Sequence, residues 1–169
     1  MAAKRTYQRG GRIPGGATVN GAQEMVWMRR TSHPRDLLFA LSSLERLDCD
    51  VIICARCAPF PIERILATAL RARGWLNPDE PALERLAGGE HYFLELRPEL
   101  LMRLAQTCGD LSTERYCAGL IVYGDTVLVE AAQMTTKLVA LSRQLGKRTV
   151  ADIAARAGLV PYTGGDVVD

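Results

Sequence analysis

The stretch from Asp50 to Gly74 reads DVIICARCAPFPIERILATALRARG and holds the clearest strand and helix signals of the chain. Its run Val51-Ile52-Ile53-Cys54 is apolar and mostly β-branched, which predicts a strand buried on both faces. A turn with two prolines follows. Pro61 suits the first position of a helix, because a missing N–H costs nothing there. We expect this helix to end at Gly74, since glycine readily adopts the left-handed conformation that terminates a helix.

Similar patterns predict the other elements of the chain. Helices are expected over 34–47, 77–88, 98–109 and 150–157, and strands over 92–96 and 119–123. Residues 25–28 form a short apolar patch that is either a strand or an anchor. Gly124-Asp125 is either a hairpin turn into a strand over 126–130 or the cap of a long helix. In either case we expect a helix that ends at Leu145, with one face lined by Met134, Leu138, Leu141 and Leu145.

Together these elements predict an α+β fold: a predominantly helical single domain with a small sheet of two to four strands. Because helices separate the expected strands, parallel pairing is favoured. With 169 residues, 48% of them hydrophobic and 24% charged, the composition is that of one globular domain. No apolar run approaches the roughly 20 residues of a membrane helix, and no secretory signal is recognised. Five cysteines, an odd number, favour free thiols in the cytoplasm.

Positive charge is concentrated near the N-terminus. Residues 1–35 hold seven basic residues against the single acid Glu24, whereas the rest of the chain holds 14 basic and 18 acidic residues. Residues 1–21 are rich in glycine and poor in large apolar side chains, so we expect a flexible basic arm before a globular domain over 22–169. The arm is either a solvated terminus or a segment that binds phosphates.

The pair Cys54-x-x-Cys57, between a strand and a helix, resembles the redox site of thioredoxin-like proteins. No aromatic residue precedes Cys54, and two prolines move the helix start away from Cys57. The spacing Cys49-x4-Cys54-x2-Cys57 is similar to a plant-type iron–sulfur run, with Cys108 or Cys117 as a fourth ligand. Since the first gap looks like a strand, we expect buried structural thiols, with no metal and no cofactor.

Two segments resemble helix-turn-helix units that bind DNA. Residues 147–159 are similar to the first helix and turn of LacI-type regulators, but Pro161 prevents a second helix. Residues 100–115 carry one residue too many in their turn. The chain has two histidines, His33 and His91, and neither lies in a hydrolase or metal motif. A Cys–His pair formed in the fold remains an alternative, although no catalytic motif is present.

These observations favour a non-enzymatic nucleic-acid-binding protein with a regulatory or accessory role. The expected phosphate contacts are Lys4, Arg5, Arg9, Arg12, Arg29 and Arg30. Any sequence specificity would come from 112–116 or 147–156, and DNA and RNA both remain open. One alternative is a protein-interaction subunit that forms an oligomer through the Met134–Leu145 face. The other is a thiol-disulfide oxidoreductase that uses Cys54-x-x-Cys57.

Overall fold

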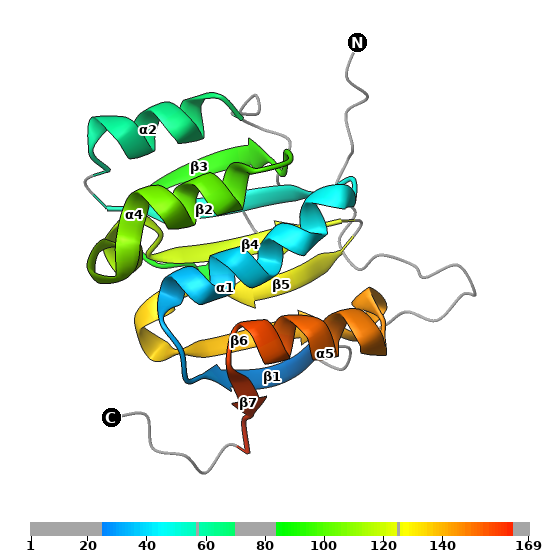
Figure 1. Ribbon diagram of the computed structural model, residues 1–169. Coiled ribbons are helices and arrows are strands. Elements are labelled where there is room, and N and C mark those ends of the chain that lie inside the picture. Colours follow the sequence, from blue (N-terminus) through cyan, green and yellow to red (C-terminus); the bar gives the residue numbers. More distant parts are fainter. Residues whose placement is uncertain (1–24, 57, 70–83, 125, 164–169) are drawn as a thin grey trace.

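A computed structural model describes residues 25–56, 58–69, 84–124 and 126–163 (Figure 1). The strands are β1 (Met25–Arg30), β2 (Asp50–Ala55), β3 (Glu90–Glu95), β4 (Gly119–Tyr123), β5 (Val127–Ala131), β6 (Leu138–Ser142) and β7 (Leu159–Pro161). The helices are α1 (Pro34–Leu41), α2 (Phe60–Ala67), α4 (Leu100–Tyr116) and α5 (Lys147–Arg156). Short 3₁₀ segments are η2 (Ser42–Arg46), η3 (Met134–Thr136) and η4 (Arg143–Leu145).

The strands form a seven-stranded sheet in the order β3-β2-β4-β5-β6-β1-β7. Every paired strand in it is antiparallel. The expectation of a predominantly helical domain with two to four strands, paired in parallel, is therefore wrong. The reason is that β5, β6, β1 and β7 are short or lack a clear alternation of polar and apolar residues. The sequence pattern therefore underestimates the number of strands in the sheet.

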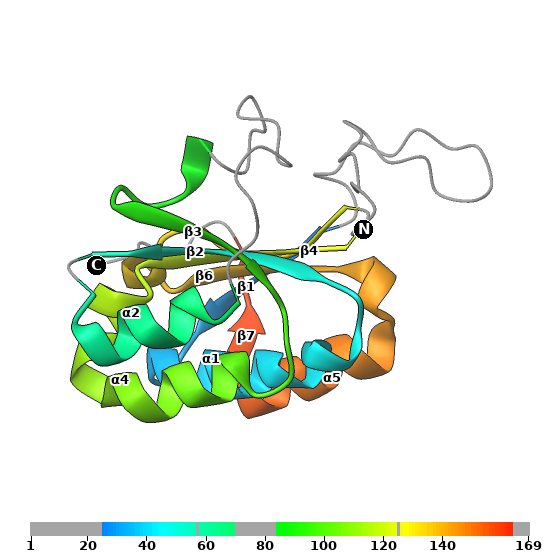
Figure 2. The same ribbon diagram turned by 90° about the horizontal axis from the view of Figure 1, so that it is seen from above.

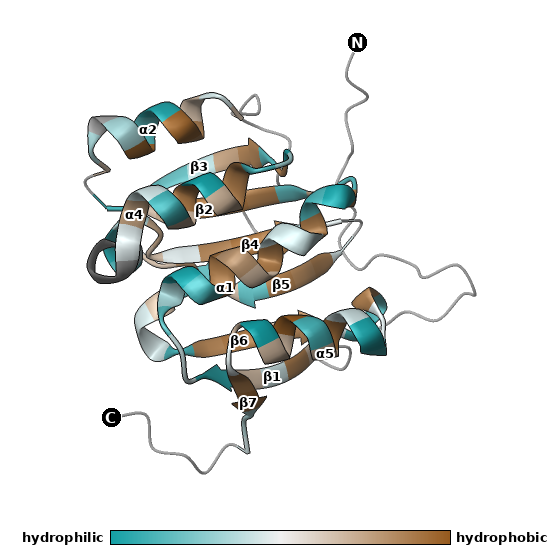
Figure 3. Ribbon diagram, in the orientation of Figure 1, coloured by the Kyte–Doolittle hydropathy of each residue, from teal (hydrophilic) through white to brown (hydrophobic). Residues whose placement is uncertain are grey.

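The four helices cover one face of the sheet, which we call the helix face; the other is the opposite face (Figure 2). On the helix face α1 packs against both α4 and α5, and α2 packs against α4. Leu37, Leu41, Leu101 and Leu104 are fully or almost fully buried in this layer. Burying one such side chain contributes about 1.5–3 kcal/mol, so this layer holds much of the stability of the fold. Apolar residues run along the central strands, whereas α5 carries both polar and apolar residues (Figure 3).

The predicted strand over Val51–Cys54 is confirmed as β2, whose six residues are all buried. It lies between β3 and β4, so both of its edges are paired. Val51 and Ile53 belong to the core on the helix face, while Ile52 and Cys54 pack in a second cluster with Leu86. The strands predicted over 92–96 and 119–123 are confirmed as β3 and β4.

The region 126–145 follows the hairpin interpretation. β5 and β6 are antiparallel strands, and η3 lies between them. The long helix ending at Leu145 is wrong, and with it the exposed Met134–Leu145 face. Met134 is 2% exposed and Leu141 is fully buried, so neither is available for an oligomer contact.

Four of the five predicted helices are present with changed ends. The helix over 34–47 is α1 followed by η2, and the helix over 150–157 begins earlier, at Lys147. α2 ends at Ala67, before the expected stop at Gly74, which lies outside the described residues. Most of the helix expected over 77–88 also lies outside them. α4 continues past Gly109, whose φ of 66° introduces a kink that a glycine tolerates.

The apolar patch over 25–28 is a strand, and its position in the sheet is unexpected. β1 lies between β6 and β7, the last two strands of the chain. Its register pairs Trp27 with Ala140 on one side and Arg29 with Val160 on the other. The N-terminal strand is therefore inserted between two strands from the far end of the sequence.

Candidate nucleic-acid interface

A single row of paired residues crosses the opposite face of the sheet. The backbone N–H of Tyr162 donates to the carbonyl oxygen of Trp27 at 3.2 Å, which extends the β1–β7 register to this pair. From there the row continues across the six remaining strands through Trp27, Ala140, Glu130, Ile121, Ile52 and Phe93. Because directly paired residues project on the same side of a sheet, all of these side chains share the opposite face.

The middle of this row and its β1–β7 end differ in exposure. Ile52 and Ile121 are fully buried, in the cluster that includes Leu86. Trp27, by contrast, is 39% exposed, and Val160, which neighbours it diagonally across the β1–β7 pair, is exposed to the same fraction. Solvent therefore reaches the sheet at its β1–β7 end.

Arg29 lies two residues beyond Trp27 on β1 and so projects from the same face. Its paired neighbours are Leu138 on β6 and Val160 on β7. We call Trp27, Arg29, Leu138, Val160 and Tyr162 the β1 patch. Within the described chain the Arg29 guanidinium makes no hydrogen bond or ion pair, so its charge is available to a ligand.

Arg30 projects from the helix face and is only 2% exposed. Its guanidinium donates hydrogen bonds to the carbonyl oxygens of Ser32 and Met134, the latter at 3.1 Å, and lies 3.7 Å from the Glu114 carboxylate. Burial lowers the pKa of Arg30, while the charges of Glu114 and Asp36 oppose this shift. Of the two adjacent arginines predicted to contact phosphate, the structure leaves Arg29 accessible and buries Arg30.

The four arm residues of the same prediction, Lys4, Arg5, Arg9 and Arg12, lie outside the described residues. The arm leads directly into β1, where the description begins at Met25.

Neither helix-turn-helix segment presents a recognition helix. After α5 the chain turns at Gly158 and enters β7, so no second helix follows. In the other segment Thr113 is fully buried and Glu114 faces Arg30. Among the side chains that the structure describes, neither segment therefore presents a helix for readout of a DNA groove.

Cys54 is fully buried, and its thiol donates to the Ala87 carbonyl oxygen at 2.9 Å. Burial raises the pKa of Cys54, although Arg56 acts in the other direction, so the reactive thiolate is disfavoured. Cys57 lies outside the described residues. Cys49 packs on the helix face and Cys54 on the opposite face, so the sheet separates two of the three residues of the iron–sulfur spacing.

His91 is the cross-strand partner of Cys54. The two side chains meet at one acceptor, because His91 Nε2 lies 3.1 Å from the Ala87 carbonyl oxygen that Cys54 also contacts. A nucleophile pair needs a direct hydrogen bond between thiol and imidazole, and here both groups are directed to the backbone instead. No set of three or more His, Cys, Asp or Glu residues in the described ranges is placed to hold a metal ion.

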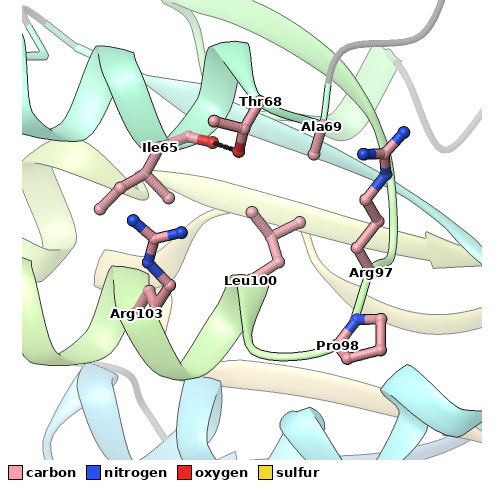
Figure 4. A pocket seen from close by; sticks show the side chains of 7 residues that line it. All are labelled: Ile65, Thr68, Ala69, Arg97, Pro98, Leu100 and Arg103. Carbon is pink, nitrogen blue, oxygen red and sulfur yellow. Dashed lines mark hydrogen bonds between the residues drawn. The ribbon is translucent and has the colours of Figure 1, made fainter.

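A pocket of about 240 Å³ lies between α2 and α4 (Figure 4). Its lining consists of Ile65, Thr68, Ala69, Arg97, Pro98, Leu100 and Arg103. Arg97 and Arg103 stand on opposite sides of Leu100, and Arg97 forms an ion pair with Glu95 at 3.2 Å. This volume is below the roughly 300–1,000 Å³ of typical small-molecule sites, so the β1 patch remains the better candidate.

Sequence reasoning missed the role of Tyr162 and left Trp27 without one. The signal for Tyr162 was the short run Val160-Pro161-Tyr162, in which alternate residues share a face and proline marks an edge strand. The signal for Trp27 was its alternation with Arg29 at a spacing of two.

Comparison of the chain with protein-family models, with curated proteins and with solved structures finds no match to any of them. In the described part of the chain, no helix has both the length and the apolar character needed to cross a membrane.

Proposed function

We propose that this protein is a non-enzymatic nucleic-acid-binding protein, with a regulatory or accessory role in the cytoplasm. The observation that carries the proposal is the position of Arg29. It is a partly exposed cation two residues from an exposed tryptophan, on the strand that follows the basic arm in the sequence. In this proposal Lys4, Arg5, Arg9 and Arg12 reach phosphates from the arm, and Arg29 contacts the same strand of nucleic acid at the sheet.

Cations gathered in one segment of the sequence suit this role for a physical reason. Each phosphate contact releases condensed counterions, so affinity arises without a preformed pocket and falls as salt rises. Arg30 is left out of the binding set, because its guanidinium already serves two carbonyl oxygens inside the fold.

The test is a fluorescence-anisotropy titration of labelled oligonucleotides with the full chain between 50 and 300 mM salt. We expect the logarithm of affinity to fall linearly with the logarithm of salt. Replacing Lys4, Arg5, Arg9 and Arg12 by alanine keeps the arm length, and it should reduce the slope by about 0.7–0.9 for each lost contact. A flat salt response, or unchanged binding after deletion of residues 1–21, contradicts the proposal.

The exposure of Trp27 and Val160 favours one alternative, a protein partner or a second copy of the chain at the β1 patch. Light scattering of the full chain separates the two functions. A monomeric mass with salt-dependent oligonucleotide binding supports the first. A dimeric mass that returns to the monomer in Trp27→Ala, without nucleic-acid binding, supports the second.

A further inference from the structure

The β1 patch has the composition of a surface on which bases stack. Trp27 and Tyr162 lie opposite each other across the β1–β7 pair, where paired side chains are about 5 Å apart. Trp27 is exposed, and Tyr162 is half-buried. On its other side Trp27 is paired directly with Ala140, a small residue that is fully buried.

Charge near these aromatic residues complements a phosphate backbone. Arg29 is two residues from Trp27 along β1, a separation of about 7 Å in a strand. That separation is comparable to the length of one nucleotide in an extended single strand. A base on Trp27 and its neighbouring phosphate on Arg29 can therefore be contacted together.

The nearest acidic side chain in the row is Glu130, one strand beyond Ala140. A bare carboxylate there would repel phosphates. Arg85 binds both oxygens of Glu130, so this part of the opposite face carries no net charge from the pair. A phosphate that approaches the β1 patch over β5 is therefore not repelled by the Glu130 carboxylate.

We infer that the β1 patch binds a single-stranded polynucleotide, with bases stacked on Trp27 and Tyr162 and a phosphate held by Arg29. This inference rests on the proposed function and names its substrate class. In a duplex the flat faces of the bases are already stacked on one another, so aromatic side chains of a sheet cannot reach them. Neither helix-turn-helix segment offers a helix for the major groove, which removes the usual way of reading a duplex.

The test compares a 12-nucleotide oligo-dT, a 12-nucleotide oligo-U and a 12-base-pair duplex, all labelled, with the full chain and its variants. Trp27→Ala should weaken single-strand binding about tenfold or more and leave the salt slope unchanged, because stacking releases no counterions. Trp27→Phe should retain most of the affinity, since it keeps an aromatic face. Met102→Ala is the matched control, an equally exposed apolar residue on α4 outside the β1 patch, and should change affinity less than twofold.

A spectroscopic readout reports on the same contact. The chain has a second tryptophan, Trp75, so the Trp75→Phe background leaves Trp27 as the only tryptophan, whose emission is selected by exciting where tyrosine does not absorb. Oligo-dT should quench this emission at saturation, and far-UV circular dichroism with a urea midpoint checks that each variant is folded.

Two failures of the test are distinguishable. If no oligonucleotide binds in a salt-dependent way, the proposed function itself is wrong. If single strands and duplex bind equally, or if Trp27→Ala binds single strands like the unaltered chain, binding occurs through the arm alone. That second result overturns the stacking inference and leaves the proposed function standing. A further comparison of oligo-U with oligo-dU, which differ only in the 2′-hydroxyl, shows whether binding depends on the sugar.

Discussion

Arg85 and Glu130 form a two-pronged ion pair on the opposite face of the sheet. Nε of Arg85 lies 2.6 Å from Oε1 of Glu130, and Nη2 lies 2.8 Å from Oε2. The Glu130 side chain is 5% exposed, whereas Arg85 is 52% exposed. The pair thus neutralises a buried carboxylate in a central strand with a guanidinium that remains in contact with water.

Removing the Arg85 cation alone should lower the free energy of unfolding more than removing both charges of the Arg85–Glu130 pair. Arg85→Ala leaves Glu130 buried without its bidentate partner, and we expect a loss of about 1–2 kcal/mol in the free energy of unfolding. Combining it with Glu130→Gln should recover part of that loss. Urea denaturation of both variants measures the difference. A double variant less stable than Arg85→Ala would show that the pair is not what stabilises this site.

Substitutions of the adjacent residues Arg29 and Arg30 should have different effects, the first on oligonucleotide binding and the second on stability. Arg30→Ala removes a buried guanidinium from two carbonyl oxygens and leaves a cavity, so we expect a loss of about 3 kcal/mol. Arg29→Ala should change stability by less than about 0.5 kcal/mol and lower the salt slope of oligonucleotide binding by about one. Thermal melts and the anisotropy titration, run on the same two variants, check both. The prediction fails if the two variants behave alike.

Glu45 of η2 acts as a cap for α4. Its two carboxylate oxygens accept hydrogen bonds from the backbone N–H groups of Glu99 at 2.6 Å and Leu101 at 2.9 Å. Glu45→Ala should therefore reduce stability by about 1 kcal/mol, measured as a lower urea midpoint at an unchanged slope. Arg46→Ala, an exposed neighbour in the same 3₁₀ segment, is the control and should be nearly neutral.

Gly119 at the start of β4 has no room for a side chain. A Cβ there would lie 2.2 Å from the Ala132 carbonyl oxygen and 2.9 Å from Cδ1 of Leu86. We expect Gly119→Ala to destabilise the fold by about 3 kcal/mol or more, because the contacted oxygen belongs to the backbone and cannot move aside. At Gly88 a Cβ would meet nothing within 4 Å, so Gly88→Ala should be tolerated. Circular-dichroism melts of both variants test this contrast.

The protein should lose stability at alkaline pH. Burial raises the pKa of Cys108 from 9.0 to about 11, and burial with a hydrogen bond to Glu90 raises the pKa of Tyr92 from 10.0 to about 12. Below pH 9 both groups are protonated in the folded and unfolded chains. As pH rises from 9 to about 12, the unfolded chain loses these protons first, so stability falls by up to about 1.4 kcal/mol per pH unit for each group.

Urea midpoints at pH 8, 9, 10 and 11 measure this effect. Cys108→Ala should flatten the decline between pH 9 and 11, after allowance for the packing lost at pH 8. A decline of the same steepness in that variant would assign the alkaline loss to other groups.

The central strands were predictable and the outer half of the sheet was not. β2 and β4 are continuous apolar runs between charged or glycine-containing segments, and such a run indicates a buried strand wherever it lies. Met134, Leu138, Leu141 and Leu145 also fit a helical spacing. Only the pairing of β5 with β6, a tertiary contact, shows that the strand interpretation is correct.

The candidate site was predictable only in part, because the charge of a residue does not indicate which face of the sheet the helices cover. Arg29 and Arg30 are adjacent and chemically identical in the sequence, and a strand necessarily sends them to opposite faces. Which of the two arginines is buried depends on the face of the sheet against which α1, α4 and α5 pack. No local sequence pattern predicts that face. Tyr162 likewise joins Trp27 only through the pairing of β1 with β7.

The insertion of β1 between β6 and β7 dictates an order of assembly during synthesis. The strands β2, β3, β4 and β5 are made consecutively and pair among themselves, so they can associate early. β1 leaves the ribosome before all of them, yet it has no partner until β6 has been translated. The nascent chain therefore carries β1, next to the basic residues of 1–21, without its sheet neighbours until β6 has been made.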